Sequence, residues 1–122
     1  MRFLVVDDST TMRRIIINTL HKVGYLETLE ASNGREGMDQ LAATGADVVI
    51  TDWNMPEMSG IEFIRAIRSN DATKTLPILM VTTNAAQDDI VEAMKAGVNN
   101  YVVKPFTPDT IKEKIESALK AA

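Results

Sequence analysis

The chain has 122 residues, 45% of them hydrophobic, and a chain of that length can bury roughly two-thirds of its unfolded surface as a single domain. We therefore expect one domain over residues 1–122, without an output domain. The formal net charge of -4 and the scattered positions of the 13 Lys and Arg residues argue against nucleic acid as a partner.

Cysteine is absent, which excludes disulfides and zinc-thiolate sites and fits a reducing compartment. The apolar stretch that begins at Phe3 is far shorter than a signal-peptide core or a membrane span. We expect a cytoplasmic monomer with no membrane partner.

Five short apolar runs predict β-strands, at Phe3 to Val6, Thr28 to Ala31, Val48 to Thr51, Ile78 to Val81 and Tyr101 to Val103. Four of them are apolar on both faces and rich in β-branched residues, which is typical of parallel strands covered from both sides. The second run is mixed in polarity and predicts an edge strand.

Apolar residues recur at helical spacing between these strands and after the last one. They form five groups, at Met12, Ile15, Ile16, Leu20 and Val23; at Met38, Leu41 and Ala42; at Ile61, Ile64 and Ile67; at Ile90, Val91 and Met94; and at Ile111, Ile115 and Leu119. The methionines at positions 12, 38, 80 and 94 are expected in the core.

Helix boundary signals agree with this pattern. Asn33 with Glu36 and Ser59 with Glu62 predict capping boxes, and Pro108 fits a first helical turn. Glycines are expected just beyond three helix ends, at Gly24, Gly45 and Gly97. Five β-α units with right-handed crossovers predict an α/β fold with a doubly wound, five-stranded parallel sheet.

Polar residues directly follow four of the predicted strands: Asp7 and Asp8, Asp52, Thr82 and Lys104. Ligands of open α/β sheets bind at the carboxyl ends of the strands. We therefore expect three carboxylates, a hydroxyl and an amine in one crevice.

The acidic residues of this crevice predict a metal site. Two like charges about 4 Å apart repel by roughly 4 kcal/mol at an effective dielectric of 20, so three carboxylates need a cation or must partly protonate. An oxygen-only cluster suits Mg²⁺, a hard ion that takes one or two protein carboxylates. The alternative is that Asp7 or Asp8 only caps the first helix near Ser9.

Lys104 and Thr82 predict that an anion also binds there, through a compact positive charge and a hydroxyl donor. An anion is compatible with the carboxylates if it is attached covalently to one of them and bridged by the metal. An aspartyl phosphate meets this description, because aspartate can accept a phosphoryl group and metal plus lysine would neutralise the developing charge.

The motifs around these residues resemble those of the receiver domains of two-component response regulators, in order and along the whole chain. They are Val5-Val6-Asp7-Asp8-Ser9, Asp52-Trp53-Asn54-Met55-Pro56-Glu57-Met58-Ser59-Gly60, Val81-Thr82-Thr83 and Tyr101-Val102-Val103-Lys104-Pro105-Phe106. The resemblance implies the flavodoxin-like receiver fold with strand order 2-1-3-4-5.

This resemblance implies a role for each site residue. Asp52 is the expected phosphoacceptor, Asp8, Asp52 and the backbone carbonyl of Asn54 are expected to bind Mg²⁺, and Asp7 is expected to help through a water molecule. Thr82 and Lys104 are expected to engage the phosphoryl group.

Tyr101 is implied to rotate on phosphorylation, and it shares a partner-binding face with Ile90, Met94 and Lys114. Tyr101 could instead be an ordinary half-buried strand aromatic. The Lys104-Pro105 bond, cis in relatives, could aim Lys104 or serve only as a turn.

Asn54 and Asn84 are expected to tune the lifetime of the phosphoryl group. Chemotaxis relatives often have Glu at the position of Asn84, so the lifetime is not fixed by the resemblance. Asn84 could instead act only as a helix N-cap with Gln87.

Within the family, the sequence is most similar to the single-domain chemotaxis regulators. That similarity implies a chemotaxis-type histidine kinase as phosphodonor, a flagellar motor switch protein as target and a phosphatase as a further partner. The protein would act on its own aspartate and would not be a turnover enzyme. The alternative within the family is a phosphorelay intermediate that passes its phosphoryl group to a histidine phosphotransfer protein.

Two other classes of protein share some of these features. A flavodoxin-like cofactor module shares the strand order, but Asp7 and Asp8 would repel the phosphate of FMN. A phosphatase of the haloacid dehalogenase type also uses an aspartate nucleophile after a strand, but it needs a second acid two residues on, where this chain has Asn54.

Overall fold

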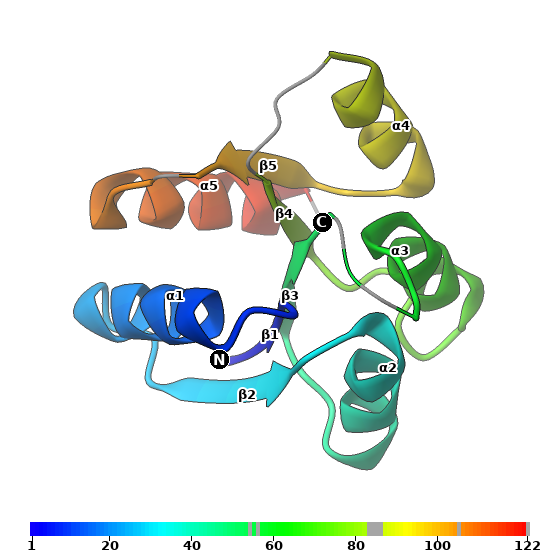
Figure 1. Cartoon of the computed structure of the whole chain (residues 1–122), viewed down its shortest axis with the longest axis horizontal. Coiled ribbons are helices and arrows are strands. Elements are labelled where there is room, and N and C mark those ends of the chain that lie inside the picture. Colours follow the sequence, from blue (N-terminus) through cyan, green and yellow to red (C-terminus); the bar gives the residue numbers. More distant parts are fainter. Residues whose placement is uncertain (54, 56, 83–86, 105, 122) are drawn as a thin grey trace.

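The computed structural model describes residues 1–53, 55, 57–82, 87–104 and 106–121 (Figure 1). Strands and helices alternate along these residues: β1 Arg2–Val6, α1 Thr10–Lys22, β2 Glu27–Ala31, α2 Gly34–Ala43, β3 Val48–Asp52, α3 Gly60–Ser69, β4 Ile78–Thr82, α4 Gln87–Ala96, β5 Asn100–Val103 and α5 Pro108–Ala121. Each strand is one residue longer than predicted, at the start for β1, β2 and β5 and at the end for β3 and β4, because backbone pairing continues past the apolar run onto a polar residue.

The strands form one parallel sheet in the order β2-β1-β3-β4-β5, which confirms the predicted fold. Strand β2 pairs with β1 at the edge of the sheet, as its mixed polarity predicted. In the register, Val6 pairs with Thr51 and Asp52 with Val81. The carboxyl ends of β1, β3 and β4 are therefore aligned at one edge.

Helices cover both faces of the sheet, with α1 and α5 on one side and α2, α3 and α4 on the other (Figure 1). Side chains alternate between these two layers along each strand. In β1, Phe3 and Val5 pack beneath α1 and α5, whereas Leu4 and Val6 pack on the opposite face, beneath α2, α3 and α4. All four side chains are fully buried, as expected for a parallel strand inside two helical layers.

The helix ends follow the sequence signals with one exception. Ser59 and Glu62 form the reciprocal capping box at α3. At α2, Asn33 accepts a hydrogen bond from the Glu36 N–H, but the Glu36 carboxylate bonds to the Ser32 hydroxyl, so only half of the predicted box is present. Helix α5 begins at Pro108 as predicted.

The three glycines predicted at helix ends lie just beyond α1, α2 and α4. Gly24, Gly45 and Gly97 have φ values of +100°, +82° and +117°. This left-handed conformation is the one in which glycine terminates helices.

Four of the apolar positions predicted at helical spacing are exposed rather than buried. Ile15, Val91 and Met94 are 44%, 43% and 47% exposed, and Ala42 is also exposed, whereas Ile17 and Ala93 are buried. In α1 the buried stripe is displaced because Thr19 can be buried, its hydroxyl donating to the Ile15 carbonyl at 2.7 Å. In α4 the small side chain of Ala93 faces the core, so Met94 points outward.

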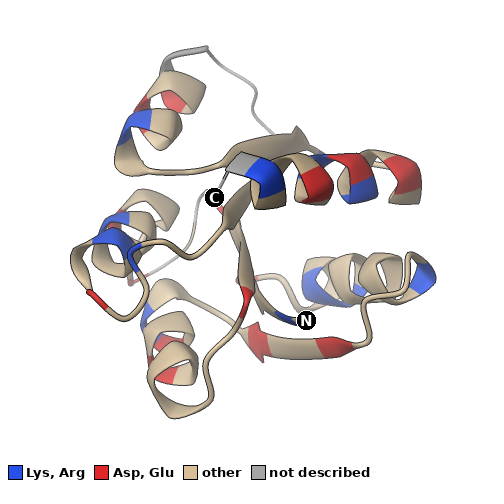
Figure 2. Ribbon diagram, turned by 180° about the vertical axis from the view of Figure 1, so that it is seen from behind, with Lys and Arg blue, Asp and Glu red and all other residues tan. Residues whose placement is uncertain are grey.

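Charged side chains are interspersed over the described surface. Figure 2 shows Lys and Arg on several helices with Asp and Glu between them. Among the described residues, no helix has both the length and the apolar character needed to span a bilayer.

Candidate functional site

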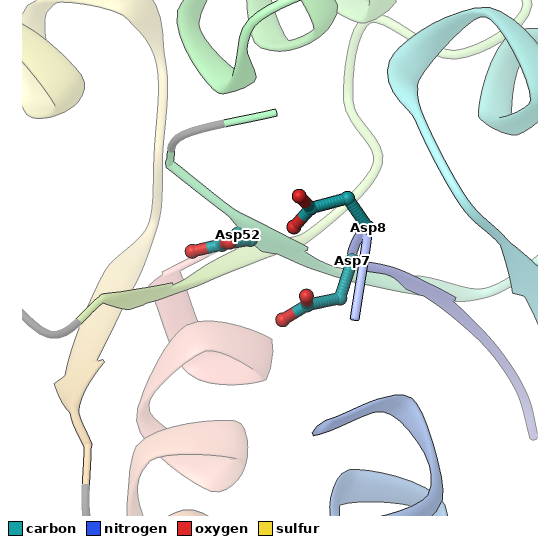
Figure 3. A group of neighbouring side chains, drawn as sticks. All are labelled: Asp7, Asp8 and Asp52. Carbon is teal, nitrogen blue, oxygen red and sulfur yellow. The ribbon is translucent and has the colours of Figure 1, made fainter. Parts of the chain in front are cut away.

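Three carboxylates meet at the carboxyl edge of the sheet. Asp7 and Asp8 follow β1, and Asp52 ends the neighbouring strand β3. One carboxylate oxygen of each lies within 4.8 Å of the other two. Figure 3 shows Asp7 and Asp8 extending from the end of β1 toward Asp52. Asp7 is buried, Asp52 is half-buried and Asp8 is exposed, so the cluster opens to solvent on the side of Asp8.

Asp7 is fixed by contacts on its backbone and on both carboxylate oxygens. Its N–H donates to the Ala31 carbonyl at 3.1 Å, and its Oδ1 accepts from the Ser9 N–H at 2.9 Å. Its Oδ2 lies 3.2 Å from Lys104 Nζ. The N-cap of α1 is Ser9, so the alternative in which Asp7 or Asp8 only caps this helix is wrong.

Asp52 lies in an environment that opposes its ionisation. Burial raises the pKa of Asp52, and repulsion from Asp7 and more weakly from Asp8 adds to this shift. Lys104, at 3.6 Å, and the Trp53 N–H, at 2.8 Å, act in the opposite direction without cancelling it. A cation bound among the three carboxylates would relieve both the repulsion and the burial cost.

Lys104 and Thr82 complete the same edge. The Lys104 N–H donates to the Thr82 carbonyl at 2.8 Å, which ties the end of β5 to the end of β4. The Lys104 side chain is 10% exposed and contacts both Asp7 and Asp52. Thr82 is buried at the end of β4. The Lys104 ammonium group thus contacts the carboxylates directly, and Thr82 lies at the end of the neighbouring strand β4.

The donor set fits a hard divalent cation. Asp7, Asp8 and Asp52 offer only oxygen ligands, of the kind Mg²⁺ prefers, and the exposed side of the cluster leaves room for metal-bound water. The expected third protein ligand, the Asn54 carbonyl, lies outside the described residues. So do Asn84, expected to tune the phosphoryl lifetime, and Pro105.

Gly60 has a role at the site that sequence reasoning missed. A Cβ at this position would lie 2.5 Å from the Asp52 carbonyl oxygen and 2.7 Å from that of Trp53. The Gly60 N–H donates to the Trp53 carbonyl at 2.9 Å. The start of α3 therefore packs directly on the chain that carries Asp52, and only glycine fits. A glycine immediately after the N-cap Ser59 was the available signal.

The residues expected to form the partner face lie around the edge strand β5. Tyr101 is partly buried against the α2–α4 layer, and Lys114 Nζ on α5 lies 5.5 Å from the centre of its ring. Met94 on α4 is exposed, and Ile90 on the same helix is partly buried. Because β5 is an edge strand, α4, β5 and α5 bound one side of the molecule (Figure 1).

A parallel sheet in the order 2-1-3-4-5, with an acidic cluster and a lysine at its carboxyl edge, defines a receiver-type site. The chain matches the response regulator receiver domain family over residues 3–116 and belongs to that family.

Individual relatives are chemotaxis proteins. The chain is 52% identical over 120 residues to the chemotaxis protein CheY1 of Helicobacter pylori, covering 98% of this chain and 97% of that protein. It is 52% identical over 116 residues to the chemotaxis protein CheY of Pseudomonas aeruginosa, covering 95% and 94%. Among solved structures, the Vibrio cholerae chemotaxis protein CheY4 superposes with a TM-score of 0.89 at 37% identity, covering 96% of this chain and 97% of that one.

Proposed function

We propose that the protein is a phosphorylation-driven binding switch of bacterial chemotaxis, with Asp52 as the phosphoacceptor and a histidine kinase as the donor. The observation that carries the proposal is the position of Asp52 between two further carboxylates and the ammonium group of Lys104. The family membership and the chemotaxis proteins among the relatives support it.

The chemistry follows from this arrangement. An oxygen of the Asp52 carboxylate attacks the phosphorus of a phosphohistidine, the P–N bond breaks, and the leaving imidazole takes up a proton from solvent. Asp7, Asp8 and Asp52 would hold Mg²⁺, which would neutralise charge on the transferring group when bound. Lys104 Nζ, 3.6 Å from Asp52 Oδ1, is close enough to donate a hydrogen bond to a phosphoryl oxygen after a small movement.

The output step uses Thr82 and Tyr101. A phosphoryl oxygen on Asp52 draws the Thr82 hydroxyl toward it, and Tyr101, two strands from Asp52, turns into the space that is vacated. The face of Ile90, Met94, Tyr101 and Lys114 then binds the flagellar motor switch protein. A coupling of about 1 to 3 kcal/mol, typical of linked sites, would tighten partner binding roughly 5- to 150-fold.

The protein transfers a phosphoryl group to its own aspartate and loses it by hydrolysis, so it is not a turnover enzyme on external substrates. A phosphatase is a further expected partner. We propose that the response regulator itself acts in the cytoplasm, which the Cys-free sequence favours.

The acceptor is tested by mass spectrometry after incubation with acetyl phosphate and Mg²⁺. One phosphoryl group should add to the parent protein and none to Asp52→Asn. A phosphoryl group found on Asp52→Asn would overturn the assignment.

The switch is tested by titrating a motor-switch peptide with and without beryllofluoride, a phosphoryl mimic. The parent should bind more tightly with the mimic, and Thr82→Ala should accept phosphate but lose much of this gain. Thr19→Ala, which removes a buried hydroxyl from α1, is the control. Equal affinities in the parent would refute the switch and favour the phosphorelay alternative.

A further inference from the structure

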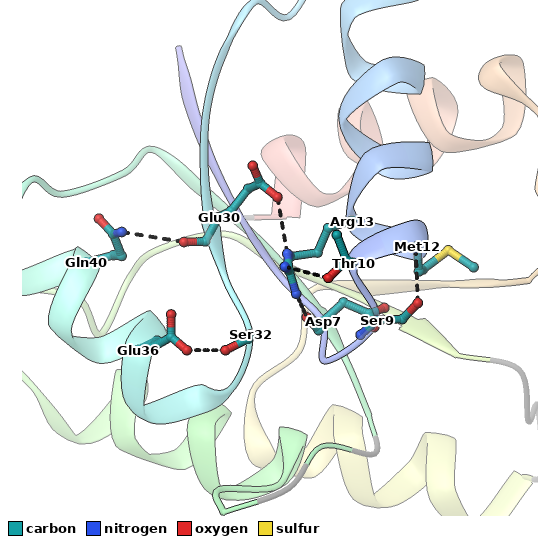
Figure 4. A network of polar contacts seen from close by, with 9 residues as sticks. All are labelled: Asp7, Ser9, Thr10, Met12, Arg13, Glu30, Ser32, Glu36 and Gln40. Atoms are coloured by element: carbon teal, nitrogen blue, oxygen red, sulfur yellow. Dashed lines mark hydrogen bonds and ion pairs between the residues drawn. The ribbon is translucent and has the colours of Figure 1, made fainter.

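Arg13 on α1 is tied to the acidic pair by a hydrogen bond to the backbone. Its Nη1 donates to the Asp7 carbonyl at 2.6 Å, its Nε donates to Glu30 Oε1 at 3.1 Å, and its Nη2 donates to Thr10 Oγ1 at 3.3 Å (Figure 4). The side chain is only 13% exposed. One guanidinium group thus links α1, the loop after β1, and β2.

The Asp7 carbonyl belongs to the peptide unit that joins Asp7 to Asp8. A peptide unit is planar, so the direction of its carbonyl fixes the direction in which the Asp8 backbone leaves it. The preceding peptide is fixed separately, by the Asp7 N–H bond to the Ala31 carbonyl. The contact with Arg13 is therefore placed to decide where the Asp8 carboxylate points, although Arg13 touches neither carboxylate group.

We infer that Arg13 is a positioning residue for the metal site, holding the Asp7–Asp8 peptide so that the Asp8 carboxylate faces Asp52. This inference rests on the proposed function, because it takes the acidic cluster to bind a divalent cation. Glu30 and Thr10 hold the guanidinium fork in the orientation that reaches the carbonyl. Groups that orient metal ligands in this way typically contribute 10- to 100-fold in metal affinity.

Charge and positioning predict opposite effects for the loss of Arg13. A cation near the cluster repels Mg²⁺, so removing its charge alone would tighten metal binding. Removing the hydrogen bond to the Asp7 carbonyl frees the peptide and would weaken metal binding. Lysine keeps the charge but has one compact ammonium group in place of the planar fork, so it cannot reproduce the three contacts.

The test is a titration of the full chain with MgCl₂, followed by the fluorescence of Trp53, the tryptophan next to Asp52. Arg13→Gln and Arg13→Lys should each bind Mg²⁺ roughly 10-fold more weakly than the parent. Arg14→Gln and Arg14→Lys are the matched controls, because Arg14 is an exposed neighbour on the same helix. They should bind like the parent or slightly more tightly. Circular dichroism establishes that each variant is folded, and Arg13→Lys decides the matter if Arg13→Gln does not fold.

The outcomes separate this inference from the proposed function. If Asp8→Ala abolishes the Mg²⁺ response while the Arg13 variants match the Arg14 variants, the metal site stands and the role of Arg13 is refuted. Tighter binding in Arg13→Gln would show that Arg13 acts only through its charge, which also refutes it. If Asp8→Ala titrates like the parent, the metal site itself is wrong and the inference falls with it.

Discussion

The ammonium nitrogen of Lys104 lies 3.2 Å from Oδ2 of Asp7, joining the ends of β5 and β1 across the two strands that separate them in the sheet. Both side chains are almost fully shielded from solvent. Lys104 therefore already supplies one positive charge to the acidic cluster, and a metal ion bound there would have to share Asp7 and Asp52 with it.

Replacing Lys104 should separate metal binding from phosphoryl acceptance. In Lys104→Gln, Mg²⁺ should bind more tightly, because the cation that competes for the carboxylates is lost. Phosphorylation by acetyl phosphate should become slower, because the transferring group loses a charged donor. Trp53 fluorescence and mass spectrometry measure the two effects. Lys112→Gln, an exposed change of equal charge on α5, is the control, and weaker Mg²⁺ binding in Lys104→Gln would contradict this account.

Asp52→Asn should stabilise the protein at neutral pH in the absence of divalent cations. Burial, followed by repulsion from Asp7, raises the pKa of Asp52 in the folded state. The folded protein then holds this proton more tightly than the unfolded chain does. That stabilisation is fully present below the unfolded pKa of about 3.9 and is lost as the pH rises through the folded pKa.

The measurement is the free energy of unfolding from urea titrations in EDTA over a series of pH values. The free energy of unfolding of Asp52→Asn should exceed that of the parent by an amount that grows as the pH rises. Asp39→Asn removes the same charge from the exposed surface of α2 and should show no such trend. Added Mg²⁺ should reduce this difference in the free energy of unfolding, because it stabilises the parent by mass action. Parallel pH profiles for Asp52→Asn and the parent would contradict a raised pKa of Asp52 in the folded protein.

Gly60→Ala should damage the site as well as the fold. The new Cβ would press on the carbonyl oxygens of Asp52 and Trp53, and overpacking of this kind costs about 1 to 3 kcal/mol. Phosphorylation of the folded variant should slow, because the chain beside the acceptor must move. Gly37→Ala is the comparison, since its Cβ would meet the Phe63 ring in the core. It should lose stability yet keep its phosphorylation rate, and equal rates in both variants would argue against a role of Gly60 at the site.

Arg68 should be the most important charged residue for stability in the α3–α4 region. Its guanidinium donates to the carbonyls of Gly97, Leu76 and Lys74 and to the Asn99 side chain. Arg68→Ala leaves these acceptors without their donor and should cost about 2 to 3 kcal/mol in urea titrations. Arg65→Ala, on the exposed side of the same helix, should cost less than about 0.5 kcal/mol. Similar losses in the two variants would refute this role.

Much of the fold and of the site could be predicted because each signal was local. The apolar runs that end at Asp7, Asp52 and Thr82 indicated where strands stop, and parallel pairing then brought their ends together. The glycines after α1, α2 and α4 were recognisable for the same reason, since a helix end needs a left-handed residue within the next few positions.

What could not be predicted depends on contacts between distant segments. Arg13 and Arg68 look like ordinary helix-surface residues, and all their acceptors except Thr10 lie outside their own helices. Ile15 and Met94 fit an apolar stripe on their helices, but the way each helix packs on the sheet buries Ile17 and Ala93 instead. The Glu36 carboxylate had two possible donors, and it accepts a hydrogen bond from the Ser32 hydroxyl rather than from the Asn33 backbone N–H.

The strand register has a consequence for how such a protein can be altered. Since Val6 pairs with Thr51 and Asp52 with Val81, backbone ladders set the spacing of the reactive side chains. Ile90, Met94 and Lys114 lie on α4 and α5, outside those ladders. Under the proposed function, the reaction and most of the recognition, Tyr101 on β5 excepted, would thus be carried by separable parts of the molecule. A library randomised at these three helical positions offers a route to receivers that accept the same phosphodonor but report to a new target.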